Sequence, residues 1–188
     1  MDPTADHVHA QQQMALLNKF EDEYCFMPFH LYDGLSGKLI TTVLRPGKVP
    51  AAGEIIAILK RVVRRIRARF PETALVFRAD SHHTKPAVMD WLEANGVGFI
   101  TGLQINARLK AEFRATLDEA RKKQARTGRD ATVYASAPYQ ARSWSRPRRI
   151  ICRVLVTANG EDMRFIASSF EQAGAKYLYE TVYCGRGA

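Results

Sequence analysis

A short apolar segment that ends on an acid constrains this chain more than any other feature. Residues 74–77 read Ala-Leu-Val-Phe and lead through Arg78 and Ala79 to Asp80. Four apolar residues are too few for a helix, so the run predicts a strand that is buried on both faces. Ligands of open α/β sheets bind at the carboxyl ends of strands, which makes Asp80 a candidate site residue. The alternative is that Asp80 caps the turn that follows.

The segments on either side of this strand have helical patterns. From 52 to 70 the apolar residues recur every three or four positions, as on one face of an amphipathic helix. A segment that begins with Lys85-Pro86 and stops at Asn95-Gly96 predicts the next helix. A strand between two helices is typical of a parallel sheet. The polar face of the first helix is either a phosphate-binding face or a solvated one, and its candidate DNA-binding residues are Arg61, Arg64 and Arg65.

Strand-rich segments lie before and after these helices. Residues 24–32 and 38–44 predict an antiparallel hairpin around a loop at 33–37. After a strand at 97–102, a helix at 107–124 and a linker at 125–129, the chain becomes rich in short strands. The expected strands are 132–134, 149–157 and 163–167, with Asn159-Gly160 as a hairpin turn between the last two. The expected last helix is 173–183.

This order of elements predicts the α/β class, with an RNase H-like mixed sheet flanked by helices and a β-rich insertion before the last helix. The hairpin and the Asp80 strand are expected in this one sheet. We expect three parts along the chain. They are an RNase H-like core with a truncated first strand at 1–124, the β-rich insertion at 125–172, and the truncated start of the final core helix at 173–188.

Charge and cysteine content narrow the function classes. The 188 residues carry a formal net charge of +9, which favours a polyanionic partner, with nucleic acid first and a membrane surface second. A merely basic soluble protein is the alternative. The three cysteines form no Cys-x-x-Cys pair, so neither a zinc knuckle nor a disulfide framework is expected, and a reducing cytosol fits. The amino-terminal residues do not resemble a signal peptide, and no apolar run approaches the roughly 20 residues of a membrane span.

Several stretches resemble motifs of bacterial insertion-sequence transposases with a DDE domain of the group 1 type. The stretch 77–81, Phe-Arg-Ala-Asp-Ser, resembles the second acidic motif of that family, R-x-D-[SG]. Tyr183 to Gly187 resembles the first half of the motif Y-x2-R-x3-E-x6-K, which carries the third acid. The remaining similar stretches follow the family's order: 2–13 for the D-x-T…H-G-x-Q opening, 32–34 for the hairpin, 44–48 for the LRPG loop, and 143–149 for a segment of the β-rich insertion.

The resemblance implies metal-dependent DNA transposition. Strand cleavage and joining is phosphoryl transfer with two divalent metals about 3.5–4 Å apart, and Mg²⁺ or Mn²⁺ would be held by carboxylates. By the match, Asp2 and Asp80 are the first two catalytic acids and metal ligands, and Tyr183 and Arg186 are DNA-binding residues. The implied partners are transposon ends, target DNA and further transposase copies, with no membrane. The implied location is the bacterial cytoplasm, with the nucleoid.

The chain also departs from the family's pattern. The third acid should follow Arg186 by four positions, which lies beyond Ala188, and His9-Ala10 stands where the family has His-Gly. We therefore expect an incomplete and inactive catalytic fragment. One alternative is a non-catalytic DNA-binding remnant that interferes with full-length transposase. Another is an unrelated basic α/β nuclease, which would need a further acid near Asp80, and only Asp90 and Glu93 are available for that role.

Overall fold

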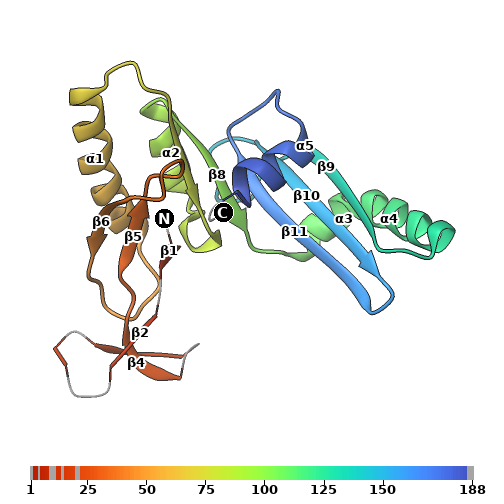
Figure 1. Ribbon diagram of the computed structural model, residues 1–188, viewed down its shortest axis with the longest axis horizontal. Coiled ribbons are helices and arrows are strands. Elements are labelled where there is room, and N and C mark those ends of the chain that lie inside the picture. Colours follow the sequence, from red (N-terminus) through yellow and green to blue (C-terminus); the bar gives the residue numbers. More distant parts are fainter. Residues whose placement is uncertain (1, 4, 9–11, 14, 20–21, 186–188) are drawn as a thin grey trace.

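The structure is a computed structural model that describes residues 2–3, 5–8, 12–13, 15–19 and 22–185 (Figure 1). It has a mixed α/β fold, built on a five-stranded sheet with the strand order β7-β8-β11-β10-β9. Strands β7 (Leu75–Ala79) and β8 (Val97–Leu103) are parallel, and the other neighbours in this sheet are antiparallel. The mixed sheet and its helices are compatible with an RNase H-like DDE domain.

The unit around Asp80 has the predicted β-α-β order. Helix α1 (Ala52–Arg69) precedes β7, and helix α2 (Pro86–Ala94) connects β7 to β8. The prediction that β7 is buried on both faces is wrong, because Val76 is 49% exposed while Phe77 and Ala79 are buried. The reason is that β7 lies at the edge of the sheet and packs one face against the core that α1 and α2 share.

The β-rich block is an antiparallel meander that extends the same sheet. Its strands are β9 (Ala131–Tyr139), β10 (Arg148–Thr157) and β11 (Gly160–Ser168), and the turn between the last two contains the predicted Asn159-Gly160. Gly160 has a φ of 148°, a conformation that favours glycine. Strand β11 pairs with β8, so the block is joined to the Asp80 unit by backbone hydrogen bonds.

The predicted hairpin exists, but it belongs to a separate sheet. Strands β5 (Phe29–Tyr32) and β6 (Leu39–Val43) pair with each other, and β1 (Asp2–Pro3) pairs with β5. The sequence predicted one sheet for this hairpin and the Asp80 strand, whereas no described pairing joins β1 to β7. Strand β1 has two residues, and Pro3 lacks an N–H to donate. A third small sheet contains β2 (Asp6–His7), β4 (Glu23–Phe26) and β3 (Leu16–Asn18).

The later helices differ from their predicted limits. The expected helix at 107–124 is two helices, α3 (Ala107–Glu112) and α4 (Arg114–Thr127), which meet at the buried Phe113. The ring of Phe113 packs 5.6 Å from that of Phe165, and this core contact accompanies the break. Helix α4 extends into the expected linker and ends at Gly128, whose φ of 65° suits a glycine C-cap. The last helix consists of α5 (Ala175–Tyr177) and the π-helix η2 (Leu178–Tyr183).

Both faces of the five-stranded sheet are packed. Helices α1, α2, α3 and α4 contribute to the larger core on one face, which includes Phe99 and Ile150. On the other face, Leu178 and Tyr179 from η2 cover Ile151 and Ile166. The segment that contains Tyr183 is therefore held against the sheet that carries Asp80.

Candidate functional site

Asp80 directly follows β7 and caps the 3-10 turn η1 (Ser81–His83). Its Oδ1 accepts the backbone N–H of His82 at 3.0 Å and the Nδ1–H of His83 at 2.7 Å. Its Oδ2 accepts the Nδ1–H of His82 at 3.0 Å. The capping role is therefore real, but the Asp80 side chain is still 21% exposed at the end of the strand. A cap alone does not need two imidazole donors, and hydrogen bonds of this kind favour the ionised carboxylate.

The surroundings keep Asp80 ionised. Burial favours the neutral carboxyl, but the hydrogen bonds and charges of His83 and His82 outweigh burial and lower the pKa of Asp80 to about 2. The His83 side chain is fully buried, with ring centroids 5.3 Å from Phe29 and 6.3 Å from Phe77. Among the described residues, its Nε2 has no hydrogen-bond partner. His82, by contrast, has a side chain that is 42% exposed.

The stretch that contains Tyr183 lies against the turn after Asp80. A Cβ built on Gly102 of β8 would lie 2.7 Å from Tyr183 Oη and 2.9 Å from the backbone nitrogen of Ser81. Such separations are too short for a real Cβ, so the position requires glycine. Thr84 adds a hydrogen bond from its hydroxyl to the Gly102 carbonyl. The structure thus brings together the second acidic motif and the tyrosine of the third.

Arg78 connects the stretch 77–81 to the hairpin loop and to the residue that precedes Tyr183. Its Nη1 donates to the carbonyl of Val182 at 2.8 Å, which joins β7 to η2. A Cβ on Gly34, in the hairpin loop, would lie 3.2 Å from Arg78 Nη2. Sequence reasoning quoted Arg78 as a motif residue and gave it no role. One signal could have indicated a role for Arg78. It is a cation inside an otherwise apolar strand, and a buried or partly buried cation needs a polar partner.

The LRPG loop, residues 44–48, holds parts of the fold together through a buried arginine and a close backbone contact. Arg45 is 4% exposed and its guanidinium lies 4.3 Å from the centroid of the Phe29 ring. Its Nη2 binds Glu54 Oε2 at 2.7 Å, and the same oxygen accepts the backbone N–H of Ala51 at 2.7 Å. Gly47 is required because a Cβ there would collide with the carbonyl of Cys25. The loop therefore fixes the start of α1 on the hairpin.

Arg148 in the 143–149 segment also has a structural role. It is 4% exposed and binds Asp90 at 2.6 Å and Glu93 at 2.7 Å. Trp144 packs under its guanidinium, and Ser145 donates to Asp90 at 2.5 Å. Both acids are therefore engaged in joining α2 to the β-rich block. The alternative of an unrelated nuclease loses the acids that it would need beside Asp80.

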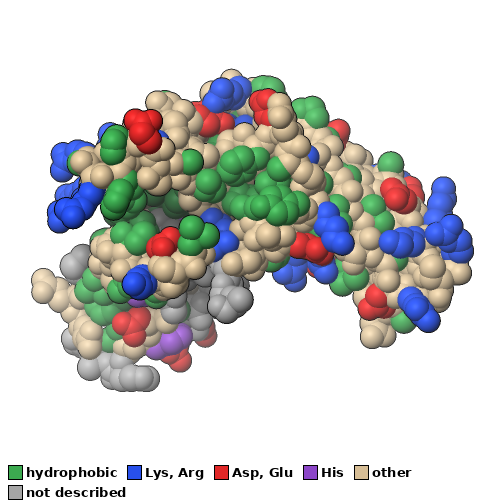
Figure 2. Space-filling view, turned by 45° about the horizontal axis from the view of Figure 1, so that its top comes forward, with side chains coloured by type: hydrophobic (Ala, Val, Ile, Leu, Met, Phe, Trp, Pro, Cys, Tyr) green, Lys and Arg blue, Asp and Glu red, His purple; other side chains and the backbone are tan. Residues whose placement is uncertain are grey.

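Three predicted site residues lie on the exposed face of α1. Among the described residues, no hydrogen-bond or ion-pair partner is present for the side chains of Arg61, Arg64 and Arg65. Arg67 differs, because it donates to the carbonyls of Pro71 and Thr73 at 3.0 Å and closes the end of the helix. Figure 2 shows Lys and Arg side chains at both ends of the long axis, with hydrophobic side chains on the surface between them.

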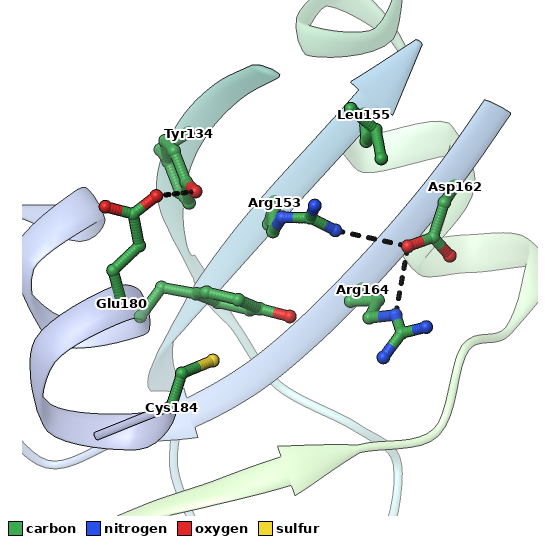
Figure 3. A pocket seen from close by; sticks show the side chains of 8 residues that line it. Tyr134, Arg153, Leu155, Asp162, Arg164, Glu180 and Cys184 are labelled. Carbon is green, nitrogen blue, oxygen red and sulfur yellow. Dashed lines mark hydrogen bonds and ion pairs between the residues drawn. The ribbon is translucent and has the colours of Figure 1, made fainter. Parts of the chain in front are cut away.

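A pocket of about 380 Å³ lies on the sheet face that η2 covers (Figure 3). Tyr134 donates to Glu180 at 2.5 Å, and burial followed by this hydrogen bond raises the pKa of Tyr134 to about 12. Arg153 and Arg164 both bind Asp162 Oδ2, at 3.2 and 2.9 Å. Asp80 does not line this pocket, so the pocket is separate from the predicted cation site.

The described residues supply part of the predicted catalytic set. Asp80 offers an ionised, partly exposed oxygen ligand, which is the donor chemistry that a divalent cation prefers. In the described part of the chain, no group of three or more His, Cys, Asp or Glu side chains is arranged to hold a metal. Asp2 is described through its backbone, which lies opposite His30 in the β1–β5 pair. Arg186 lies outside the described residues.

Together, the fold and the site define a mixed α/β protein with an ionised carboxylate at the carboxyl end of a parallel strand. The family described as transposase DDE domain group 1 matches residues 1–188, the whole of the chain. The chain therefore belongs to this family of transposases, whose substrate is DNA and which generally use divalent metals. A search of curated proteins finds no match to it. Within the described residues, no helix has both the length and the apolar character needed to cross a membrane.

Proposed function

We propose that this chain is a transposase catalytic domain that carries out metal-dependent cleavage and joining of DNA strands. The observation that carries the proposal is the ionised and partly exposed Asp80 carboxylate at the end of β7, with Tyr183 beside the turn that follows. In this proposal, residues 1–124 form an RNase H-like core, residues 125–172 are the β-rich insertion, and residues 173–188 begin the final core helix. Asp2 and Asp80 are the first two acids.

Each group has a role that follows from its chemistry. A divalent cation, Mg²⁺ or Mn²⁺, would neutralise charge on the phosphate that reacts. Asp80 would hold the cation, and Asp2 would be the second carboxylate of the set. Tyr183 and Arg186 would bind the DNA backbone near the acids, and Arg61, Arg64 and Arg65 would bind it further away. Transposon ends, target DNA, further copies of the chain and a location with the bacterial nucleoid belong to the same proposal.

A nicking assay tests the catalytic proposal. We expect nicking of supercoiled plasmid when Mg²⁺ or Mn²⁺ is present. Asp80→Asn should reduce nicking to the background, and Asp118→Asn, at an exposed acid of α4, should leave it unchanged. Metal-dependent nicking that survives Asp80→Asn would contradict the proposal.

A second candidate function is DNA binding without chemistry, with interference in the action of a full-length transposase. The observation that favours it is the set of exposed, unpaired arginines on α1 in the described structure. It predicts salt-sensitive duplex binding, no metal-dependent nicking, and inhibition of a full-length transposase in a mixed reaction. Complete absence of nicking together with tight DNA binding would favour this candidate over the first.

A further inference from the structure

The two histidines hold different sides of the Asp80 carboxylate. His83 is fully buried and donates to Oδ1, which also accepts the backbone N–H of His82. Oδ2 has one described partner, the Nδ1–H of His82, in a side chain that is 42% exposed. Oδ2 is therefore the oxygen with fewer described donors, and its one donor belongs to a partly exposed ring.

The separation of these two atoms suits a shared cation. Neighbouring ligands at right angles around a six-coordinate ion, with bonds of about 2.1 Å, are about 3 Å apart. Nδ1 of His82 and Oδ2 of Asp80 are 3.0 Å apart. A cation bound to both atoms lies off the line that joins them, so the His82 ring has to turn until its Nδ1 lone pair points at the ion, and the exposure of this side chain leaves room for that turn. The ring then keeps one proton, on Nε2, and a doubly protonated ring releases its other proton to water.

We propose that His82 is a cation ligand beside Asp80 and that it gives the site a preference for first-row transition ions, such as Co²⁺ or Zn²⁺, over Mg²⁺. The proposal rests on the proposed function, in which Asp80 holds a divalent cation. Imidazole nitrogen suits transition ions, whereas Mg²⁺ takes oxygen ligands. His83 has a different role, because its buried ring positions Oδ1 and does not reach a hydrated ion.

The test uses Co²⁺ and Mg²⁺ as separate probes, with affinity measured by calorimetry on the wild-type chain and on variants. His82→Ala should lower the Co²⁺ affinity by at least about tenfold more than it lowers the Mg²⁺ affinity, because only Co²⁺ loses a ligand. Proton NMR of the Co²⁺-loaded wild-type chain in water should show a strongly shifted, exchangeable N–H resonance from the His82 ring. His82→Ala and His82→Gln should lose that resonance. Unfolding curves like that of the wild-type chain would show that both variants are folded.

His7→Ala is the matched control, because His7 Nδ1 lies 2.8 Å from a carboxylate oxygen of Glu23 in a different sheet. It should keep the Co²⁺ affinity and the shifted resonance. An unchanged Co²⁺ affinity and resonance in His82→Ala would overturn the inference, as would a wild-type chain that does not bind Co²⁺. Asp80→Asn separates the two proposals. If it leaves Mg²⁺ and Co²⁺ binding intact, Asp80 is not a cation ligand and the proposed function fails at this residue.

Discussion

Arg78 and Val182 are 104 positions apart in the chain, yet Arg78 Nη1 donates to the Val182 carbonyl at 2.8 Å. The bond runs from the Asp80 strand to the helix that ends at Tyr183. Because Asp80 lies two residues after Arg78 and Tyr183 one residue after Val182, the bond fixes the distance between the two motifs. The placement of Tyr183 relative to Asp80 therefore depends on Arg78, although Arg78 is not one of the predicted catalytic residues.

Replacing Arg78 by Met should loosen the last helix. The hydrogen bond from a charged donor contributes about 1.5–3 kcal/mol, and its loss should lower the free energy of unfolding by a similar amount. Chemical denaturation monitored by circular dichroism measures this change. Arg61→Met, at an exposed cation of α1, should change stability by less than about 0.5 kcal/mol. Equal effects of the two substitutions would mean that the Val182 contact contributes little.

Gly102→Ala should push apart the two motifs that meet at Gly102. The added Cβ would lie 2.7 Å from Tyr183 Oη and 2.9 Å from the backbone nitrogen of Ser81, so overpacking should cost about 1–3 kcal/mol. The matched control is Gly53→Ala in α1, where a Cβ meets no atom within 4 Å. That control should stabilise the chain by up to about 1 kcal/mol. A thermal shift of the same sign in both variants would contradict the close approach at Gly102.

The Arg148 ion pairs predict acid-sensitive stability. Burial raises the pKa of Glu93, but hydrogen bonds and charge from Arg148 and Arg146 outweigh burial. The pKa of Glu93 is therefore lowered from its usual value of 4.5. A lowered pKa in the folded state gives stability that is present above about pH 4.5 and is lost as pH falls below it. Glu93→Gln should therefore lower the melting temperature at pH 7 and reduce its pH dependence between about pH 5 and 3. Unchanged pH dependence would contradict the proposed coupling.

The basic face of α1 should contribute to DNA binding through phosphate contacts. Changing Arg61, Arg64 and Arg65 together to Gln should weaken duplex binding and reduce the log–log salt slope by about 0.9 for each contact that is lost. Fluorescence anisotropy from low to physiological salt measures both quantities. The control removes the same charge from α4, with Lys122, Lys123 and Arg126 changed to Gln. Equal effects of the two triple variants would show that net charge, and not the α1 face, controls binding.

Much of the local structure was predictable because each signal is short-ranged. Pro86 starts α2 and Asn159-Gly160 makes the turn before β11, as the sequence indicated. The wrong predictions concern tertiary context. Whether Val76 is covered depends on which strand lies beside β7, and Phe113, where α3 and α4 meet, packs on a ring far along the chain.

The sequence located part of the candidate site, and the roles of its residues stay predictions. Asp80 and Tyr183 were identified by their motifs, and the structure places both beside Gly102. The roles of His82 and His83 were missed, because adjacent histidines in a turn indicate nothing until the direction of each ring is known. The placement of the Asp2 and Arg186 side chains stays a prediction.

The pairing of β8 with β11 has a consequence for how the chain folds. The meander of β9, β10 and β11 and the β7-α2-β8 unit each consist of contacts between neighbouring segments, which form quickly. The β8–β11 ladder alone joins these two units within the sheet, and it closes a loop that contains α3, α4 and two strands. Loop closure of this kind is entropically costly before its contacts form. We expect docking of β11 on β8 to be the slow step of folding, so that the surroundings of Asp80 are completed last.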